Sequence, residues 1–324
     1  MQELVRLVGI ARLAAEGSLL AEKRRVEYRS LPTRNWLNRC DSQRVPFDWT
    51  INPYRGCEYG CKYCYARFTH EFLEKPEIEA FETEIYAKDL AAGQLERELR
   101  QVKPGQVIAL GTATDPYQPA ERKFGLTRRV LEAVGHVAAG ISFFITTKSD
   151  LVARDAALLR KIAEKNLVRV TITVTTMDAK LAKLTEPFAP RPDLRMSAVR
   201  GLVQAGVHAG VIASPVLPWI TDSCENLEGV ARAAKEAGAD QFGAHVLFLK
   251  PAARRTYFPF IEKKFPRLAA RYDRRYAAGA YLKGKYPEEI RERIREIRLR
   301  VGIGERDLAR AAPPPVAGAQ MDLF

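Results

Sequence analysis

Features that would place this chain in a membrane or in an extracellular class are missing from its sequence. No stretch of the 324 residues approaches the roughly eighteen consecutive apolar residues that a membrane-spanning helix needs. The first twenty residues lack the uncharged apolar block of a secretory signal, because Glu3 and Glu16 interrupt them. Only five cysteines are present, which excludes a disulfide scaffold in a chain of this length. We therefore expect a cytoplasmic protein with no membrane partner.

The composition is that of a globular protein with a basic charge at its ends. Hydrophobic residues make up 47% and charged residues 28%, enough for one large domain or two modest ones. The formal net charge of +13 divides into +3 for residues 1–50, +2 for 51–250 and +8 for 251–324. A nearly neutral centre with basic flanks suggests that the centre performs chemistry while the flanks contact a polyanion.

The basic flank is densest in residues 253–285, where ten lysines and arginines stand against two acidic residues. Seven aromatic residues are interleaved with these cations: Tyr257, Phe258, Phe260, Phe265, Tyr272, Tyr276 and Tyr281. Bases stack on aromatic rings while cations hold phosphates. We therefore predict that residues 253–285 bind nucleic acid, with DNA favoured. The alternative is a solvated helical surface, as in residues 291–300, where Arg alternates with Glu.

Six short β-rich runs succeed one another along the centre of the chain, and a helical segment follows each except the last. The runs are residues 48–52, 106–112, 141–147, 168–176, 208–217 and 241–249. The helices are predicted at about 82–101, 121–138, 150–165, 194–205 and 223–237. Such alternation predicts an α/β fold with a parallel sheet buried on both faces.

Six strand–helix units fit a partial (β/α)6 barrel, whose site lies at the C-terminal ends of the strands. A doubly wound sheet is the alternative, but no G-x-G-x-x-G follows any of the strands. The barrel would occupy residues 51–250, between an N-terminal extension (1–50) and a basic, mostly helical extension (251–310). Residues 311–324 contain three consecutive prolines and small residues, which predicts a disordered tail.

The segment NPYRGCEYGCKYCYAR (52–67) directly follows the first predicted strand and contains a Cys-x3-Cys-x2-Cys cluster. Its members are Cys57, Cys61 and Cys64. Three thiolates are one short of a closed tetrahedral zinc site, for which His70 is the nearest fourth ligand. In a four-iron cluster, three thiolates leave one iron open to a substrate or cofactor.

The spacing, with Tyr63 just before the third cysteine, resembles that of the radical S-adenosylmethionine (SAM) superfamily. The resemblance implies a [4Fe-4S] cluster whose open iron chelates the amino and carboxylate groups of SAM. Reduced by an electron donor, such a cluster cleaves the sulfonium and releases a 5′-deoxyadenosyl radical, which takes hydrogen from the substrate. The protein then supplies binding and excludes side reactions.

The same resemblance implies SAM-binding residues at successive strand ends. The second strand end would meet the amino group, the third the carboxylate, the fourth the ribose and the fifth the adenine. In that order the residues are Thr112, Thr114 and Asp115; Lys148 and Ser149; Thr173 and Thr175; Ile212 and Ser214. Ser214 replaces a glycine of the superfamily pattern. For Lys148 the alternative is a solvated surface lysine, and for the strand-four threonines the ordinary β-propensity of branched residues.

Within the superfamily, the chain is similar to the spore photoproduct lyase-like branch over roughly residues 48–250. The matching stretches are the cysteine segment, GTATDPYQPAE, TTKSD, and EPFAPRPDLR through SPVLPWITD. This resemblance implies action on DNA damage. The enzyme that names the branch returns hydrogen from a cysteine where this chain has Thr112, and an O–H bond is too strong to substitute. Repair by that route is therefore not expected. Cys224 is the alternative hydrogen donor. Without such a role, Cys224 and Cys40 are interpreted as packed or surface thiols.

The last five residues resemble the peptide by which bacterial replication and repair proteins dock on the DNA sliding clamp. They are Gln320, Met321, Asp322, Leu323 and Phe324. The apolar side chains would anchor the peptide, and the Gln320 amide would add hydrogen bonds. The alternative is that Leu323 and Phe324 pack back on the barrel.

Together these patterns predict a SAM-dependent iron–sulfur enzyme that acts on DNA damage or another nucleic acid, with no catalytic side chain assigned. One alternative is a radical SAM enzyme that acts on a peptide or small molecule. The other is a metal-binding nucleic-acid module without turnover.

Overall fold

A curved sheet of eight strands forms the centre of the protein, in the order β12-β11-β10-β9-β8-β7-β4-β3. The computed structural model describes residues 7–23, 25–42, 45–75, 77–89 and 91–305. The six inner strands are parallel: β4 (Trp49–Ile51), β7 (Val107–Leu110), β8 (Ser142–Thr147), β9 (Leu167–Thr173), β10 (His208–Val216) and β11 (Gln241–Val246). They coincide with the six predicted runs.

The order of these strands distinguishes the two predicted topologies. Each parallel strand pairs with the next one along the chain, and the order never reverses. A doubly wound sheet would reverse at a switch point. The predicted α/β class with the partial (β/α)6 arrangement is therefore confirmed. β3 (Leu37–Arg39) adds to one edge antiparallel, and β12 (Gly304–Glu305) adds to the other edge parallel.

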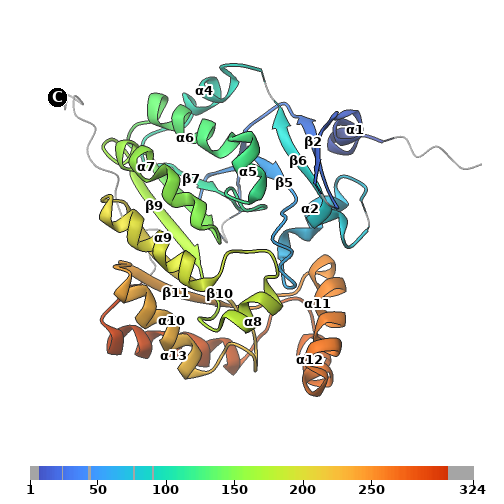
Figure 1. The fold of residues 1–324 in the computed structure, drawn as a ribbon, viewed down its shortest axis with the longest axis vertical. Helices are drawn as coiled ribbons and strands as arrows, with labels where there is room; N and C mark the ends of the chain where they lie inside the picture. The colour runs from blue at the N-terminus through green and yellow to red at the C-terminus, as the bar shows by residue number, and fades with distance from the viewer. Residues whose placement is uncertain (1–6, 24, 43–44, 76, 90, 306–324) are drawn as a thin grey trace, which may run out of the picture.

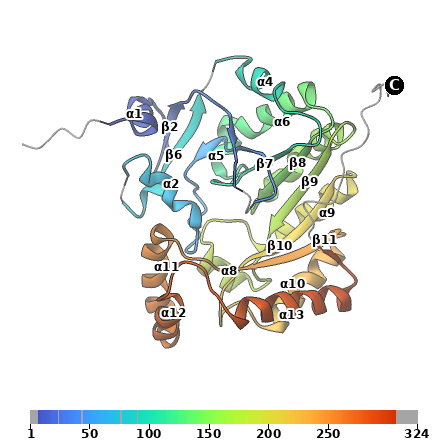
Figure 2. The same ribbon diagram turned by 180° about the vertical axis from the view of Figure 1, so that it is seen from behind.

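Helices cover the outer side of this sheet (Figures 1 and 2). All seven residues of β9 are buried, as expected for a strand covered on both faces. On α6, the side chains of Val130, Leu131 and Val134 are fully buried in the main core. The helices on this side are α5 (Pro119–Phe124), α6 (Leu126–Val137), α7 (Ala156–Ile162), α9 (Pro192–Gln204) and α10 (Cys224–Glu236).

A second, four-stranded sheet has the order β1-β2-β6-β5 and contains a clear error in the predicted elements. Its strands are β1 (Leu19–Lys23), β2 (Val26–Pro32), β6 (Glu84–Asp89) and β5 (Tyr54–Arg55). A single helix was predicted over about 82–101, but the chain forms β6 and then α4 (Gln94–Leu99). β6 is parallel to β2 and antiparallel to β5, and four of its six residues are buried. Pairing with a strand from the N-terminal extension overrides the local helical preference.

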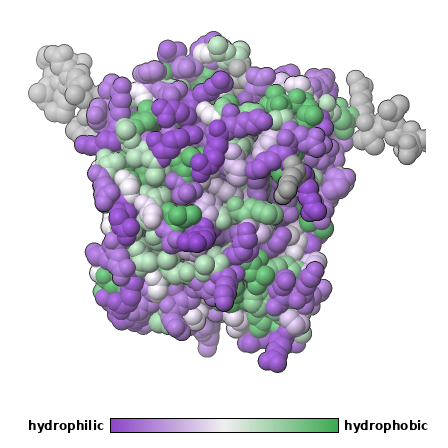
Figure 3. Space-filling model, in the orientation of Figure 1, coloured by the Kyte–Doolittle hydropathy of each residue, from purple (hydrophilic) through white to green (hydrophobic). Residues whose placement is uncertain are grey.

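The short helices around the cysteine segment and the second sheet complete the N-terminal half. They are α1 (Gly9–Glu16), η1 (Tyr65–Arg67), α2 (Phe68–Glu71) and α3 (Ala80–Thr83). In the face shown in Figure 3, hydrophilic residues dominate the surface and hydrophobic ones are scattered among them. None of the helices in the described ranges has the length and apolar character that crossing a membrane requires.

The C-terminal extension is helical, with α11 (Pro251–Lys264), η3 (Pro266–Leu268), α12 (Ala269–Tyr276) and α13 (Lys285–Val301). Tyr257, Tyr272 and Tyr276 are fully buried in a core that they share with the cysteine segment. These three rings are therefore not available to stack on bases, contrary to our interpretation of the interleaved pattern. Tyr281 differs, because 55% of its surface is exposed. The predicted tail, with residues 320–324, lies outside the described residues.

Candidate functional site

A cavity of about 870 Å³ opens at the C-terminal ends of the parallel strands. All three clustered cysteines line it, on a segment that follows β5. The predicted SAM-binding residues that also line it come from five different parts of the chain: Tyr63, Thr112, Thr114, Asp115, Lys148, Thr173, Ile212 and Ser214. The fold thus gathers residues more than 150 positions apart around one space.

The cysteine segment begins with a glycine that the backbone packing requires. Gly56 has φ +80°, and a Cβ at this position would lie 2.8 Å from the carbonyl oxygen of Glu84. The next amide, that of Cys57, donates to the Phe81 carbonyl at 2.8 Å. The Gly56 carbonyl accepts from Thr114 Oγ1 at 2.5 Å. These contacts hold the start of the segment against α3 on one side and the loop after β7 on the other.

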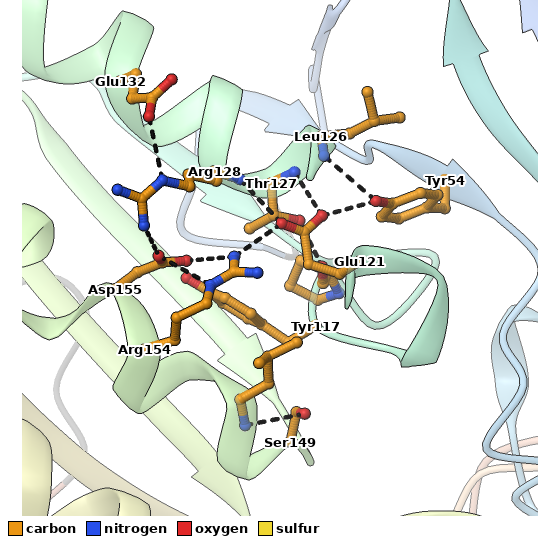
Figure 4. A network of polar contacts seen from close by, with 12 residues as sticks. Tyr54, Tyr117, Glu121, Leu126, Thr127, Arg128, Glu132, Ser149, Arg154 and Asp155 are labelled. Atoms are coloured by element: carbon orange, nitrogen blue, oxygen red, sulfur yellow. Dashed lines mark hydrogen bonds and ion pairs between the residues drawn. The ribbon is translucent and has the colours of Figure 1, made fainter. Parts of the chain in front are cut away.

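A network of polar contacts connects β5, α5 and the residues that follow β8 (Figure 4). The buried Glu121 carboxylate on α5 accepts from Tyr54 Oη at 2.6 Å, from the Thr127 amide at 2.8 Å and from Arg154 Nη2 at 2.9 Å. Arg154 also pairs with the buried Asp155 at 2.7 Å. The network joins β5, which leads into the cysteine segment, to η2 (Asp150–Asp155), which follows β8.

A buried ion pair lies under the cysteine segment. Glu186 and Arg195 expose 1% of their surface each, and Arg195 Nη2 is 2.5 Å from Glu186 Oε2. Tyr63 Oη donates to Glu186, and Arg195 Nη1 donates to the Thr173 carbonyl at 3.0 Å. Burial alone would raise the pKa of Glu186, but Arg195 and Lys148 hold that pKa below its usual range. The pair therefore joins the cysteine segment to the end of β9.

Our sequence reasoning missed this pair. Glu186 stands just after α8 (Ala179–Thr185), and Arg195 lies in α9. Both belong to the stretch EPFAPRPDLR, whose similarity to the lyase-like branch was the only sequence signal.

Replacing Glu186 with alanine is expected to lower the free energy of unfolding by about 3–5 kcal/mol, because it leaves the Arg195 guanidinium buried without its counter-charge. Urea denaturation of the iron-free protein measures this. The control is Glu292→Ala, which removes an exposed partner of Arg295 and should change stability far less. Equal losses in the two variants would show that the buried pair has no special part in holding the segment.

Asp115 lies on the cavity wall, but its carboxylate is already engaged. Oδ1 accepts from Thr147 Oγ1 at 2.6 Å and from the Tyr117 amide at 3.0 Å, and Oδ2 accepts from the Lys148 amide at 2.7 Å. Burial raises the pKa of Asp115. These bonds connect the ends of β7 and β8, so the carboxylate positions the neighbouring loops.

Lys148 extends into the cavity and is not a solvated surface lysine. Its side chain is half-buried, with Nζ 5.6 Å from the centre of the Tyr63 ring. Burial lowers the pKa of Lys148, but its interactions with the Cys61 sulfur and the Glu186 carboxylate outweigh burial and raise that pKa above its ordinary value. An ammonium held in this way can receive a carboxylate.

Some of the other predicted residues line the cavity, whereas others make hydrogen bonds to neighbouring residues and do not line it. Thr173 and Ile212 are paired across β9 and β10 and reach the cavity together. Ser149 and Thr175 do not line it. Ser149 Oγ accepts from the Leu151 amide at 3.2 Å and caps η2, whereas Thr175 Oγ1 lies 3.4 Å from Glu186 Oε1.

Aromatic rings form a row at the mouth of the cavity. Tyr65 and Phe248 have ring centres 5.3 Å apart, and Phe248 stacks on Tyr281 at 5.1 Å with an interplanar angle of 14°. All three line the cavity, and 39% of Tyr65 and 55% of Tyr281 are exposed. Sequence reasoning singled out only Tyr281, because nothing local shows that residues 65, 248 and 281 meet.

The predicted fourth zinc ligand, His70, does not lie with the three cysteines. It places Nε2 3.0 Å from the Glu84 carbonyl and packs between Phe81 and Tyr86, away from the cavity. In the part of the chain that is described, no group of three or more His, Cys, Asp and Glu side chains is already placed to hold a metal ion, and this includes the three cysteines. Burial raises the pKa of Cys61 to about 12, so thiolates here need metal cations beside them. The cavity next to the thiols offers room for SAM.

Consecutive parallel strands with a three-cysteine segment at their C-terminal ends define the class of radical SAM enzymes. Residues 51–245 match the family model of the Radical SAM superfamily, and this chain belongs to that superfamily. It is 35% identical over 282 residues to an uncharacterized protein of Mycobacterium tuberculosis, which covers 85% of this chain and 80% of the relative. An uncharacterized protein of Methanocaldococcus jannaschii is 31% identical over 174 residues, or 54% of this chain and 62% of that protein.

Solved structures share the fold at low sequence identity. Spore photoproduct lyase complexed with dinucleoside spore photoproduct superposes with a TM-score of 0.62 at 16% identity, over 85% of this chain and 79% of the other. SuiB of Streptococcus suis, bound to its precursor peptide SuiA, has a TM-score of 0.50 at 16% identity, over 79% of this chain and 47% of the other. At these identities the likeness shows the fold alone.

Proposed function

We propose that this radical SAM enzyme acts on a nucleic acid, with damaged DNA as the favoured substrate. The observation that carries the proposal is the aromatic row of Tyr65, Phe248 and Tyr281 at the mouth of the cavity. Exposed rings in a row are platforms on which unpaired bases stack, whatever their sequence. The basic excess of residues 251–324 lies on the same part of the chain as Tyr281.

Each part of the cavity would then have its own task. Cys57, Cys61 and Cys64 would hold the [4Fe-4S] cluster, and Lys148 would meet the carboxylate of SAM. When bound there, SAM supplies a 5′-deoxyadenosyl radical that takes a hydrogen atom from the substrate. The aromatic row would hold a base at the mouth, which brings the nucleotide to the cavity and excludes water.

One observation supports a DNA lesion as the substrate. A second separates the reaction from that of the structural neighbour. The fold resembles a lyase that has been solved with a dinucleoside photoproduct. However, Thr112 stands where the lyase branch has its hydrogen-donating cysteine, and its Oγ1 is bound to Asn52 Nδ2 at 3.1 Å. The Thr112 hydroxyl cannot return a hydrogen atom to the substrate radical, so we do not propose the final step of the lyase branch for this protein.

Product analysis tests the substrate class. The reconstituted protein is reduced without oxygen and incubated with SAM and oligonucleotides that are either intact or ultraviolet-irradiated. We expect the damaged oligonucleotides to change in mass and to accelerate formation of 5′-deoxyadenosine. If neither oligonucleotide changes while 5′-deoxyadenosine still accumulates, the proposal fails. The peptide alternative, to which the SuiB fold likeness gives some support, would then be favoured.

Lys148→Ala is expected to weaken SAM binding by roughly 10- to 150-fold, because a hydrogen bond to a charged group contributes about 1.5–3 kcal/mol. The change should leave iron content unaltered, since Lys148 contributes no thiolate. Equilibrium dialysis with labelled SAM gives the dissociation constant. Lys62→Ala is the control, on a half-buried lysine of the cysteine segment that does not line the cavity. An unchanged dissociation constant for Lys148→Ala would remove Lys148 from the SAM site.

A further inference from the structure

A second concavity, of about 320 Å³, lies between α12 and the start of α13. It is separate from the cysteine cavity, and the two have no lining residue in common. Its lining contains four cations, two large aromatic rings and one carboxylate: Arg271, Arg275, Lys283, Lys285, Trp219, Tyr286 and Glu289. The local formal charge is therefore strongly positive.

The four cations are not neutralised by acidic neighbours. Within the described ranges, none of them has a carboxylate oxygen within 4.0 Å, and Glu289 itself takes part in no ion pair. The arginines farther along α13 behave differently. Arg295 pairs with Glu292 at 2.5 Å and Arg300 with Glu228 at 2.9 Å. Unpaired cations around a concavity repel one another, which favours an anionic ligand between them.

Aromatic rings rather than carboxylates position the two guanidiniums. Arg271 stacks over the Trp219 ring at 4.3 Å, and Arg275 stacks over the Tyr286 ring at 4.7 Å. A stacked guanidinium keeps its N–H donors in the plane of the group, where they can meet the oxygens of a phosphate. Such cations are ordered before any ligand arrives.

The two rings are themselves held by the core. Trp219 packs edge-on against the buried Tyr272, whose Oη donates to the Pro218 carbonyl at 2.7 Å. Tyr286 Oη donates to Asp222 Oδ2 at 2.7 Å. The wall of the concavity is thus joined to the loop that follows β10, the same strand that brings Ile212 to the catalytic cavity.

The concavity lies near the mouth of the cavity that the three cysteines line. Tyr281, in the aromatic row, is two residues from Lys283, so their Cα atoms are at most about 7.6 Å apart. In a second segment, Pro215 lines the cavity and Trp219, four residues later, lines the concavity. One nucleic-acid strand can therefore contact both.

We propose that this concavity binds backbone phosphodiesters of the strand whose base lies on the aromatic row. The inference rests on the proposed function, which makes the substrate a nucleic acid, and it assigns the phosphate contacts to particular residues. Arg271 and Arg275 hold the phosphate oxygens by hydrogen bonds, while Lys283 and Lys285 add charge. The phosphate contacts set the position of the strand, and the row receives the base.

Fluorescence anisotropy with a labelled single-stranded thymidine dodecamer tests the assignment. The variant Arg271→Gln/Arg275→Gln is compared with Arg291→Gln/Arg295→Gln, which removes the same charge from exposed arginines of α13. We expect the first variant to bind at least tenfold more weakly and the control to bind within twofold of the unmodified protein. The slope of log K against log salt should fall by about 1.4 in the first variant alone, for two lost phosphate contacts.

Two further measurements identify the anion and control for folding. A dodecamer with neutral methylphosphonate linkages should bind the unmodified protein at least tenfold more weakly than the natural dodecamer. For the Arg271/Arg275 variant, in which Lys283 and Lys285 remain, the ratio of the two affinities should be smaller. Lys283→Gln/Lys285→Gln should weaken binding in the same direction at unchanged melting temperature. If millimolar inorganic phosphate weakened the apparent affinity for the natural dodecamer tenfold, the concavity would be a site for free phosphate and the assignment would be overturned.

The outcomes separate this inference from the proposed function. If the dodecamer binds and the Arg271/Arg275 variant binds it as tightly as the control variant does, the phosphate assignment is wrong while the substrate class stands. If the unmodified protein binds no oligonucleotide, damaged or intact, both are wrong.

Discussion

Replacing Cys61 with alanine is expected to abolish iron loading and SAM cleavage, while Cys224→Ala leaves both intact. Cys57, Cys61 and Cys64 line the cavity, the first two buried and Cys64 half-buried, whereas Cys224 is exposed at the start of α10, 3.4 Å from Arg300. A cluster that loses one of three thiolates keeps too few ligands to remain bound, so the loss should be complete rather than graded. Iron analysis after anaerobic reconstitution, together with chromatographic detection of 5′-deoxyadenosine, measures both effects.

Cys57→Ala and Cys64→Ala should give the same result, and Cys40→Ala should resemble Cys224→Ala. Because Cys40 is half-buried and does not line the cavity, its variant also controls for the loss of a thiol as such. Iron loss in Cys224→Ala as complete as in Cys61→Ala would replace the three-cysteine assignment with a four-cysteine site.

The second large effect is expected at the end of the chain, where we propose a ligand for the bacterial DNA sliding clamp. A peptide spanning residues 312–324 should bind the isolated clamp with micromolar affinity, roughly −8 kcal/mol, because a short linear peptide loses conformational entropy when it binds. Leu323→Ala together with Phe324→Ala should remove detectable binding, since these side chains are the apolar anchors. Isothermal titration calorimetry measures both peptides.

Asp322→Ala is the matched control and should bind nearly as well, because an exposed charge contributes little. In the full chain, the double change should leave SAM cleavage and melting temperature unaltered. No binding of the unchanged peptide at high micromolar concentration would contradict the proposal. A double variant with a lower melting temperature would show that Leu323 and Phe324 belong to the core.

The six parallel strands were predictable because they appear in the sequence as short runs rich in apolar and β-branched residues between helical segments, as in residues 141–147 and 168–176. β6 was not, because its partner β2 lies more than fifty residues earlier and the local sequence carries no sign of that pairing. Burial of Tyr257, Tyr272 and Tyr276 was missed for a related reason. An aromatic residue between cations has the same local pattern whether it packs inward or faces solvent.

The cysteine cluster and the strand-end residues of the site were predictable because they follow a fixed order along the chain. The contacts that position them were not, since the bond from Tyr63 to Glu186 joins residues that are 123 positions apart. The aromatic row was missed for the same reason, because Tyr65, Phe248 and Tyr281 come from three separate segments. Long-range juxtaposition is the part of the site that the fold alone reveals.

We propose that the radical formed at this cavity takes its hydrogen atom from a nucleic acid. The most direct test is to incubate the reduced, SAM-loaded protein with irradiated oligonucleotides whose thymidines carry deuterium on the methyl and sugar carbons. We expect mass spectrometry to detect deuterium in the 5′-deoxyadenosine, and none when the oligonucleotide is unlabelled. If 5′-deoxyadenosine forms at the same rate with and without the oligonucleotide and carries no deuterium, a nucleic acid is not the substrate.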